Sequence, residues 1–386
     1  MTNPISRRHF LKRCSRCAFL WAGLPLLSLA PEPPPAGAAA LKKGLIGKKL
    51  SPYYTSLGNR EIRCELCPHG CEVSPGERGL CEVRENIDGR YYSLVYANPC
   101  AVHVDPIEKK PFYHVLPTTR SFSIATAGCN FNCKFCQNWE ISQARPEDTY
   151  NYRLYPQDVV RQALAYGCHS IASTYVEPTI FMEYMLETGR LAKAAPLLKV
   201  MHSNGFINRA PLDDLCRYLD AACIDLKGFS EDFYREMADG MLQPVLNSLK
   251  QLNARGIHTE IVNLLVPGKN DDPKMIKAMC RWIGAELGPD TPLHFSRFYP
   301  RYKLKGTPPT PVETLDSARK IAMAEGLLYV YIGNVAYHPG EHTYCPNCRQ
   351  MLIKRIGYSV QVTGMTGARC NRCGEKIPGI WKMPAV

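Results

Sequence analysis

The chain has 386 residues, of which 45% are hydrophobic and 21% charged, so it is long enough for one large globular domain and one or two small ones. Its net charge is +12, but five basic residues against Glu32 place +4 of this within residues 1–40, and no long basic run follows. We therefore expect a solvated surface and no nucleic-acid partner. The eighteen cysteines predict metal sites rather than a disulfide framework, because eleven of them fall in three tight clusters with Cys-x2-Cys spacing.

Residues 1–40 are typical of an export signal followed by a linker. The stretch Ser6-Arg7-Arg8-His9-Phe10-Leu11-Lys12 closely matches a twin-arginine signal, and an apolar run at 18–30 follows it. The run is short for a membrane span, and the small residues at 36–40 offer cleavage sites. The segment predicts export by the twin-arginine route, to the periplasm or with a retained membrane anchor. If the signal is not used, the protein stays cytoplasmic.

We expect residues 41–118 to form a Cys-rich N-terminal domain. Its four clustered thiols are Cys64, Cys67, Cys71 and Cys81. Four thiolates can close a tetrahedral zinc site or hold an auxiliary iron–sulfur cluster, and His69 could replace one of them as a ligand. Their uneven spacing leaves both interpretations open, with disulfides as a third alternative. Residues 91–118 then alternate between apolar and polar in a strand-like way.

Three further cysteines follow an apolar run at intervals of four and three residues, and they are Cys129, Cys133 and Cys136. A four-iron cluster held entirely by protein takes four cysteines, so a set of three leaves one iron open to a small molecule. On a straight helix Cys129 and Cys136 would lie about 10 Å apart along the axis, so the segment must form a loop. Gly128, Asn130 and Asn132 favour such a loop. The alternatives are a lone structural metal site and buried free thiols.

Residues 119–335 alternate between apolar strands and helical stretches. We predict strands at 121–126, 170–174, 197–202, 222–226, 258–266, 292–295 and 328–332, and helices at 156–165, 180–193, 242–255, 273–287 and 312–324. Strand–helix alternation implies parallel strands with right-handed crossovers. The predicted fold class is therefore α/β, a partial or full parallel β/α barrel whose reactive groups sit just past the carboxyl ends of the strands.

Polar residues follow three consecutive strands at those ends. They are Glu177 after the second strand, Ser203 and Asn204 after the third, and Asp225 and Lys227 after the fourth. Singly, each has a simpler interpretation, since Glu177 can cap the following helix and Asn204 with a following glycine is an ordinary turn pair. Their shared position at successive strand ends favours a common site.

Residues 336–386 contain two Cys-x2-Cys pairs separated by twenty-one residues, and the paired cysteines are Cys345, Cys348, Cys370 and Cys373. This spacing is close to that of a zinc ribbon, and the residues at 351–363 between the pairs are mostly strand-like. We predict a structural zinc site, with a redox or rubredoxin-like iron site as the alternative.

The loop at 129–136, with an aromatic residue before its last cysteine, resembles the signature of the radical S-adenosylmethionine (SAM) superfamily. The resemblance implies that the open iron of a [4Fe-4S] cluster binds the amine and carboxylate of SAM. One electron from the cluster then cleaves SAM to a 5′-deoxyadenosyl radical, which abstracts hydrogen from a substrate.

The resemblance also implies roles for the strand-end residues. Glu177 matches the acid that bonds the methionine amine, although Tyr175 and the next residue replace the usual Gly-Gly pair. Ser203 and Asn204 match positions near the SAM carboxylate and ribose. Asp225 and Lys227 match the Asp-Leu-Lys of activating enzymes, in which the aspartate can bind a cation or face the sulfonium.

Taken together, the motifs after residue 60 resemble the AmmeMemoRadiSam-system radical SAM enzymes, which are relatives of the pyruvate formate-lyase activating enzymes. These motifs lie at 64–71, 105–111, 129–138, 175–179 and the two terminal Cys pairs. The resemblance implies a low-potential electron donor and partners of the Memo and AMMECR types, but it supplies no substrate. Because activating enzymes take hydrogen from a glycine of a partner protein, we expect a protein substrate.

A second class of function stays open. A non-catalytic, exported iron–sulfur protein for electron transfer or scaffolding would also need the cysteine clusters. It would need no SAM pocket, so Glu177, Asn204 and Asp225 discriminate between the two classes.

Overall fold

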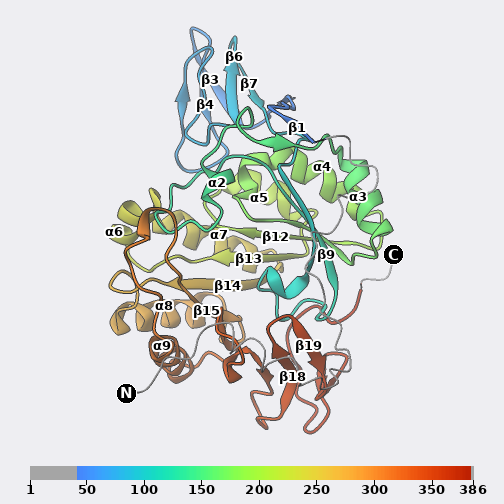
Figure 1. Ribbon diagram of the computed structural model, residues 1–386, viewed down its shortest axis with the longest axis vertical. Helices are drawn as coiled ribbons and strands as arrows, with labels where there is room; N and C mark the ends of the chain where they lie inside the picture. Colours follow the sequence, from blue (N-terminus) through green and yellow to red (C-terminus); the bar gives the residue numbers. More distant parts are fainter. Residues whose placement is uncertain (1–40, 384–386) are drawn as a thin grey trace, which may run out of the picture. The chain divides into compact units, whose positions relative to one another are not determined.

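The computed structural model describes residues 41–383, so the expected export signal lies outside the described residues. An eight-stranded sheet forms the centre of this range, in the order β16-β15-β14-β13-β12-β11-β9-β8 (Figure 1). Its strands are β8 (Ala101–Pro106), β9 (Arg120–Ala125), β11 (Ser170–Ser173), β12 (Leu198–Ser203), β13 (Ala221–Asp225), β14 (His258–Leu265), β15 (Leu293–Arg297) and β16 (Val330–Gly333).

The strands from β9 to β16 are parallel neighbours in chain order, and β8 pairs antiparallel with β9. Each crossover connects a parallel strand to its immediate neighbour in the sheet, so β8 and β16 form the two edges. The sheet is therefore open, which corresponds to the partial barrel of the two predicted forms. The predicted strands of this region agree with the observed ones to within two residues. Strand β11 is buried along its whole length, as expected for a parallel strand with both faces covered.

Helices connect the parallel strands. The longer ones are α3 (Pro156–Ala165), α4 (Met182–Ala192), α5 (Arg209–Cys216), α7 (Leu242–Ala254), α8 (Pro273–Glu286) and α9 (Val312–Ala324). A proline in the first turn suits the start of α3 and α8, and the Asp272 side chain accepts a hydrogen bond from the backbone N–H of Lys274 to cap α8. Short elements are η1 (Ile107–Lys109), α2 (Trp139–Ser142), η2 (Pro178–Phe181), α6 (Glu231–Phe233), η3 (Tyr234–Ala238), η4 (Tyr302–Leu304) and η5 (Pro339–Glu341). Within residues 41–383, no helix has both the length and the apolar character that crossing a membrane requires.

Small antiparallel sheets precede the central one. Strands β3, β4 and β5 form one of them, and β2, β7 and β6 form the other, while β1 pairs with β10 (Figure 1). Their bounds are β1 (Lys42–Lys43), β2 (Lys49–Leu50), β3 (Tyr54–Gly58), β4 (Glu61–Cys64), β5 (Glu72–Val73), β6 (Arg84–Ile87), β7 (Arg90–Ser93) and β10 (Tyr150–Asn151). The strand-like pattern at 91–118 holds for β8, which joins the central sheet, whereas residues 110–118 contain no strand.

The C-terminal tail is built from short strands. These are β17 (Thr343–Tyr344), β18 (Met351–Ile356), β19 (Ser359–Val362), β20 (Met365–Thr366) and β21 (Arg369–Cys370). Strands β18 and β19 pair antiparallel within the residues predicted to be strand-like. The buried Arg355 of β18 donates hydrogen bonds to the backbone carbonyl of Tyr113, at 2.8 Å, and to the hydroxyl of Thr343, at 2.7 Å. The tail is thereby fastened to the segment between β8 and β9.

Candidate functional site

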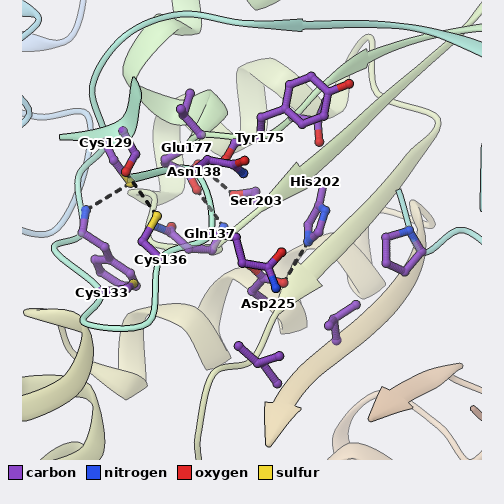
Figure 2. Close-up of a pocket in the computed structure, with 18 of the residues that line it drawn as sticks. Cys129, Cys133, Cys136, Gln137, Asn138, Tyr175, Glu177, His202, Ser203 and Asp225 are labelled. Atoms are coloured by element: carbon purple, nitrogen blue, oxygen red, sulfur yellow. Dashed lines mark hydrogen bonds and ion pairs between the residues drawn. The ribbon is translucent and has the colours of Figure 1, made fainter. Parts of the chain in front are cut away.

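A cavity of about 590 Å³ opens at the carboxyl ends of the parallel strands. Figure 2 shows the cysteine loop on one side of this cavity and the ends of β11, β12 and β13 on the other. All eight residues predicted for the radical SAM site line it, and they are Cys129, Cys133, Cys136, Glu177, Ser203, Asn204, Asp225 and Lys227. The structure therefore brings together residues that are spread over nearly a hundred positions of the chain.

The cysteine loop leaves β9 at Gly128, which has a left-handed backbone with φ of +90°. A Cβ at this position would lie 2.7 Å from the carbonyl oxygen of Cys81, so the position requires glycine. Asn130 and Asn132 do not take a positive φ, contrary to one reason for expecting them here. The Asn130 side chain instead donates to the carbonyl of Phe206, at 2.9 Å, and accepts from the amide of Asn204, at 2.8 Å. Asn130 thus fastens the loop to the end of β12.

The three loop cysteines are free thiols. The Cys129 sulfur accepts a hydrogen bond from the backbone N–H of Phe131, at 3.4 Å, and the Cys136 sulfur lies 3.2 Å from the hydroxyl of Ser142. Burial raises the pKa of the Cys133 thiol to about 12, although the Lys227 charge opposes the shift. Binding a metal to these thiols therefore has to release their protons.

Glu177 lies in the turn after β11 and is only 2% exposed. Its Oε1 accepts hydrogen bonds from the backbone N–H and hydroxyl of Thr179 and from the hydroxyl of Ser203, at 2.9, 2.6 and 2.8 Å. Its Oε2 accepts one hydrogen bond, from the backbone N–H of Asn204, at 2.7 Å. Burial raises the pKa of Glu177, and these hydrogen bonds to the carboxylate oppose the shift. The Oε2 atom therefore keeps capacity for one further donor.

Asp225 at the end of β13 carries two ion pairs. Its Oδ1 lies 2.8 Å from Nε2 of His202, and its Oδ2 lies 3.0 Å from Nζ of Lys227 (Figure 2 shows the first). Burial disfavours the carboxylate, but the charges of Lys227 and His202 outweigh it and hold the pKa of Asp225 well below its usual range. His202 was missed at the sequence level, although its place directly before Ser203 at the end of β12 was a usable signal.

Tyr175 stands where the resemblance expects a glycine pair, and its backbone is left-handed, with φ of +68°. The position thus has the left-handed conformation that glycine adopts without strain, and tyrosine adopts it here. The Tyr175 hydroxyl bonds the carboxylate of Asp105, which also pairs with Lys110, and the Tyr175 carbonyl accepts from the amide of Asn138 at 2.7 Å. Asn138 and Tyr175 both line the cavity, and the sequence did not predict either.

The C-terminal cysteines come together. The sulfur atoms of Cys345, Cys348, Cys370 and Cys373 all lie within 4.8 Å of one another. The separation is 3.5 Å between Cys345 and Cys373 and 3.6 Å between Cys348 and Cys370. Within residues 41–383, this is the only set of three or more His, Cys, Asp or Glu side chains with such close ligand atoms.

The N-terminal cysteines also gather, with a wider spacing. The N–H of Cys64 donates to the carbonyl of Cys71 at 2.9 Å. Burial raises the pKa of the Cys67 thiol, and the charges of Cys64, Cys81 and Cys71 add to the shift. His69 lies in the same segment, but its Nε2 is 2.7 Å from the carbonyl oxygen of Asn130, so this ring already has a partner.

Comparison with known proteins shows to which family the chain belongs. The model of the radical SAM superfamily matches residues 123–283. An uncharacterised protein of Methanocaldococcus jannaschii is 45% identical over 327 residues, which is 84% of this chain and 97% of that protein. The pyruvate formate-lyase-activating enzyme of Listeria monocytogenes is 23% identical over 177 residues, which is 42% of this chain and 68% of that enzyme.

A solved radical SAM methyltransferase from Sphaerobacter thermophilus is 16% identical, with a TM-score of 0.45, over 59% of this chain and 68% of that one. The match of the superfamily model covers the cysteine loop and the strand ends that line the cavity. The chain belongs to the radical SAM superfamily and is similar to the pyruvate formate-lyase activating enzymes.

Proposed function

We propose that this protein is a radical SAM enzyme that abstracts a hydrogen atom from a protein substrate. One observation carries the proposal: three free thiols and the buried Glu177 face one cavity at the strand ends. A [4Fe-4S] cluster bound there with SAM supplies a 5′-deoxyadenosyl radical by reductive cleavage of SAM. A non-catalytic electron carrier would use the thiols and the cap that Glu177 makes, but it would need no further acceptor capacity on Glu177 Oε2 at the cavity.

The donor set fits such a cluster. Cys129 and Cys136 contact an N–H and a hydroxyl, both of which can stay in place beside a ligated thiolate. The three thiols lie on one eight-residue loop, and they leave the fourth iron of the cluster open to a small molecule. Lys227 beside Cys133 is a cation that favours the thiolate form of this ligand.

The strand ends would orient SAM. The free acceptor capacity of Glu177 Oε2 suits the methionine ammonium, because a charge-assisted hydrogen bond is strong in a buried site. Ser203 and Asn204 are held beside it by their own bonds to Glu177 and suit the carboxylate and ribose. Asp225 is bonded to His202 and Lys227, so its contribution is to hold the imidazole and the ammonium at the cavity wall.

Within the superfamily, we assign the protein to the AmmeMemoRadiSam-system enzymes. The motifs at 64–71, 105–111, 129–138 and 175–179 support this assignment. Its Memo-type and AMMECR-type proteins would be partners, together with a low-potential electron donor. A protein substrate is supported by the open sheet and by the exposed Tyr358, which the β18–β19 turn brings to the cavity. The twin-arginine signal, if used, would deliver the folded enzyme to the periplasm or a membrane anchor.

The C-terminal group would hold a structural zinc ion. Tetrahedral zinc with Zn–S bonds of about 2.3 Å needs sulfur atoms about 3.8 Å apart. The separations of 3.5 and 3.6 Å approach this requirement. Zinc here would stabilise the tail that brings Tyr358 to the cavity.

The function is tested by anaerobic reconstitution with iron and sulfide, followed by dithionite and SAM. We expect 5′-deoxyadenosine from the wild type. Cys133→Ser should lose both the cluster and the product, because two thiolates do not hold four irons stably. Cys216→Ser, which removes a partly exposed thiol on α5 outside the three clusters, is the matched control and should behave as wild type. Wild-type protein that holds the cluster but forms no 5′-deoxyadenosine would support the electron-carrier alternative. Stimulation of the product by a candidate partner protein would identify the substrate.

A further inference from the structure

The four N-terminal thiols, for which the sequence leaves zinc and an auxiliary cluster open, lie at the edge of the cysteine loop. The N–H of Cys64, at the end of β4, bonds the carbonyl of Cys71, directly before β5. A Cβ on Gly79 would lie 3.5 Å from the Cys71 sulfur, and Gly79 accepts the backbone bond of Glu82 at 2.9 Å. The Cys71 sulfur therefore lies against the turn that leads to Cys81, and the charges of Cys64 and Cys71 both raise the pKa of the Cys81 thiol. Cys67 lies in the loop between Cys64 and Cys71.

Sulfur spacing separates this group from the C-terminal one. The C-terminal four have the close spacing of ligands around one ion, all within 4.8 Å. Within residues 41–383, no three of the N-terminal thiols come that close together, and the same holds for Cys129, Cys133 and Cys136. A four-iron cluster is a cube with iron and sulfide at alternate corners, and each thiolate binds one iron from outside the cube, so the thiolates stand farther apart than the ligands of a single ion. The spacing therefore favours a cluster over zinc for the N-terminal group.

The two cysteine segments are in direct contact. The Nε2 atom of His69, between Cys67 and Cys71, lies 2.7 Å from the carbonyl oxygen of Asn130, which follows Cys129. The carbonyl of Cys81 packs against Gly128, which precedes Cys129. The segment thus touches the radical SAM loop on both sides of its first cysteine.

A buried ion pair holds this contact rigid. The Arg84 guanidinium bonds both carboxylate oxygens of Glu183 on α4, at 2.9 and 2.6 Å, and its Nε bonds the carbonyl of Ile180 at 3.1 Å. Both side chains of this pair are at most 5% exposed. Because this pair is buried and both carboxylate oxygens are bonded, it fixes Arg84, three residues after Cys81, to the segment that follows Glu177.

The group also has an inner and an outer side. Cys64 and Cys67 are buried, whereas Cys71 and Cys81 are partly exposed, and the neighbouring Leu80 is 69% exposed. We propose that Cys64, Cys67, Cys71 and Cys81 hold a second [4Fe-4S] cluster, which relays single electrons from an external low-potential donor to the cluster at Cys129, Cys133 and Cys136. This relay rests on the proposed function for its destination.

The relay makes and breaks no bonds. A donor of the ferredoxin or flavodoxin class, or dithionite in the test tube, gives one electron to the N-terminal cluster and is oxidised. That cluster passes the electron to the radical SAM cluster and returns to its oxidised state. The electron is consumed when the carbon–sulfur bond of SAM breaks.

Metal analysis of the wild-type protein, reconstituted anaerobically, is the first test. We expect about eight irons and eight sulfides per chain, and about one zinc. Four irons with two zinc ions would overturn the second cluster. Eight irons without any SAM-induced change in the EPR spectrum would support the second cluster and contradict the proposed function instead.

The second test uses variants and rapid-freeze EPR after mixing with dithionite. The double variant Cys64→Ser, Cys71→Ser should lose about four irons, keep the SAM-induced EPR change, and reduce the radical SAM cluster at least ten-fold more slowly. His69→Leu removes no ligand, so it should keep all eight irons and slow the transfer several-fold. Cys216→Ser is the control. Wild-type reduction rates in both variants would overturn the relay. If the double variant does not fold, the wild-type iron count tests the second cluster and the reduction rate of His69→Leu tests the relay.

Discussion

The carboxylate of Glu177, in the turn after β11, accepts a hydrogen bond of 2.7 Å from the backbone N–H of Asn204, the residue after β12. The same carboxylate caps η2 through the N–H of Thr179. Glu177 is therefore the helix cap of the simpler interpretation, and it also joins two strand ends at the cavity. A cap alone needs no contact with β12, so this second bond gives the residue a place in the site.

Glu177→Gln should weaken SAM binding while the cluster stays intact. Glutamine keeps the size of the side chain but loses the charge, and a hydrogen bond to a charged partner is worth about 1.5–3 kcal/mol, on the order of ten- to a hundred-fold in affinity. We expect native iron and sulfide contents, with the SAM-induced EPR change shifted to higher SAM concentration. Glu187→Gln on α4, which pairs with Lys49 outside the cavity, is the matched control. Wild-type SAM binding by Glu177→Gln would reduce Glu177 to a cap.

SAM affinity should fall on acidification. The pKa of Glu177 is raised by burial, so protonation begins at a higher pH than for an ordinary glutamate. The attraction for the SAM ammonium is present above this raised pKa and is lost as the pH falls through it. The free energy of unfolding of the SAM-free protein changes in the opposite direction. It should rise as the pH falls, because the folded state binds this proton more tightly than the unfolded chain. EPR titration with SAM at several pH values checks the prediction, and Glu177→Gln should show a flat profile.

The C-terminal tail should bind one zinc ion independently of iron. Replacing Cys345 and Cys370 together by Ser takes one thiolate from each close pair, so metal analysis should give about one zinc fewer with iron unchanged. Cys216→Ser should lose no zinc. A parallel loss of iron would show that the two sites are not separate.

Export should depend on the arginine pair. Replacing Arg7 and Arg8 by Lys keeps the charge but removes the guanidinium groups of the signal, so a reporter fused to residues 1–40 should remain inside the cell. Fractionation of cells with wild-type and Lys fusions measures this. A wild-type fusion that is retained in the cytoplasm would make the segment a basic tail without an export role.

Local patterns in the sequence were sufficient for much of the fold. Apolar runs separated by helical stretches predicted the strands of residues 119–335 and the helices α3, α4, α7, α8 and α9, but not α5. Burial of a strand on both faces and a proline in the first turn of a helix are visible in local sequence. The cysteine spacings, which are also visible in local sequence, predicted the loop at 129–136 and the C-terminal group of four thiols. The shared position of Glu177, Ser203 and Asp225 at strand ends was also visible, since parallel strands present their carboxyl ends at one edge.

Only the tertiary structure decided how these pieces meet. The ion pair between His202 and Asp225 joins neighbouring strands, the left-handed backbone of Tyr175 is accompanied by a bond to Asp105 of β8, and His69 meets Asn130 across sixty-one positions. Contacts of this kind leave no periodic trace in the sequence, because each depends on the packing of segments that are distant along the chain. The spacing of the sulfur atoms in each cluster is decided in the same way, since it follows from the folded path of the backbone and not from the number of residues between cysteines.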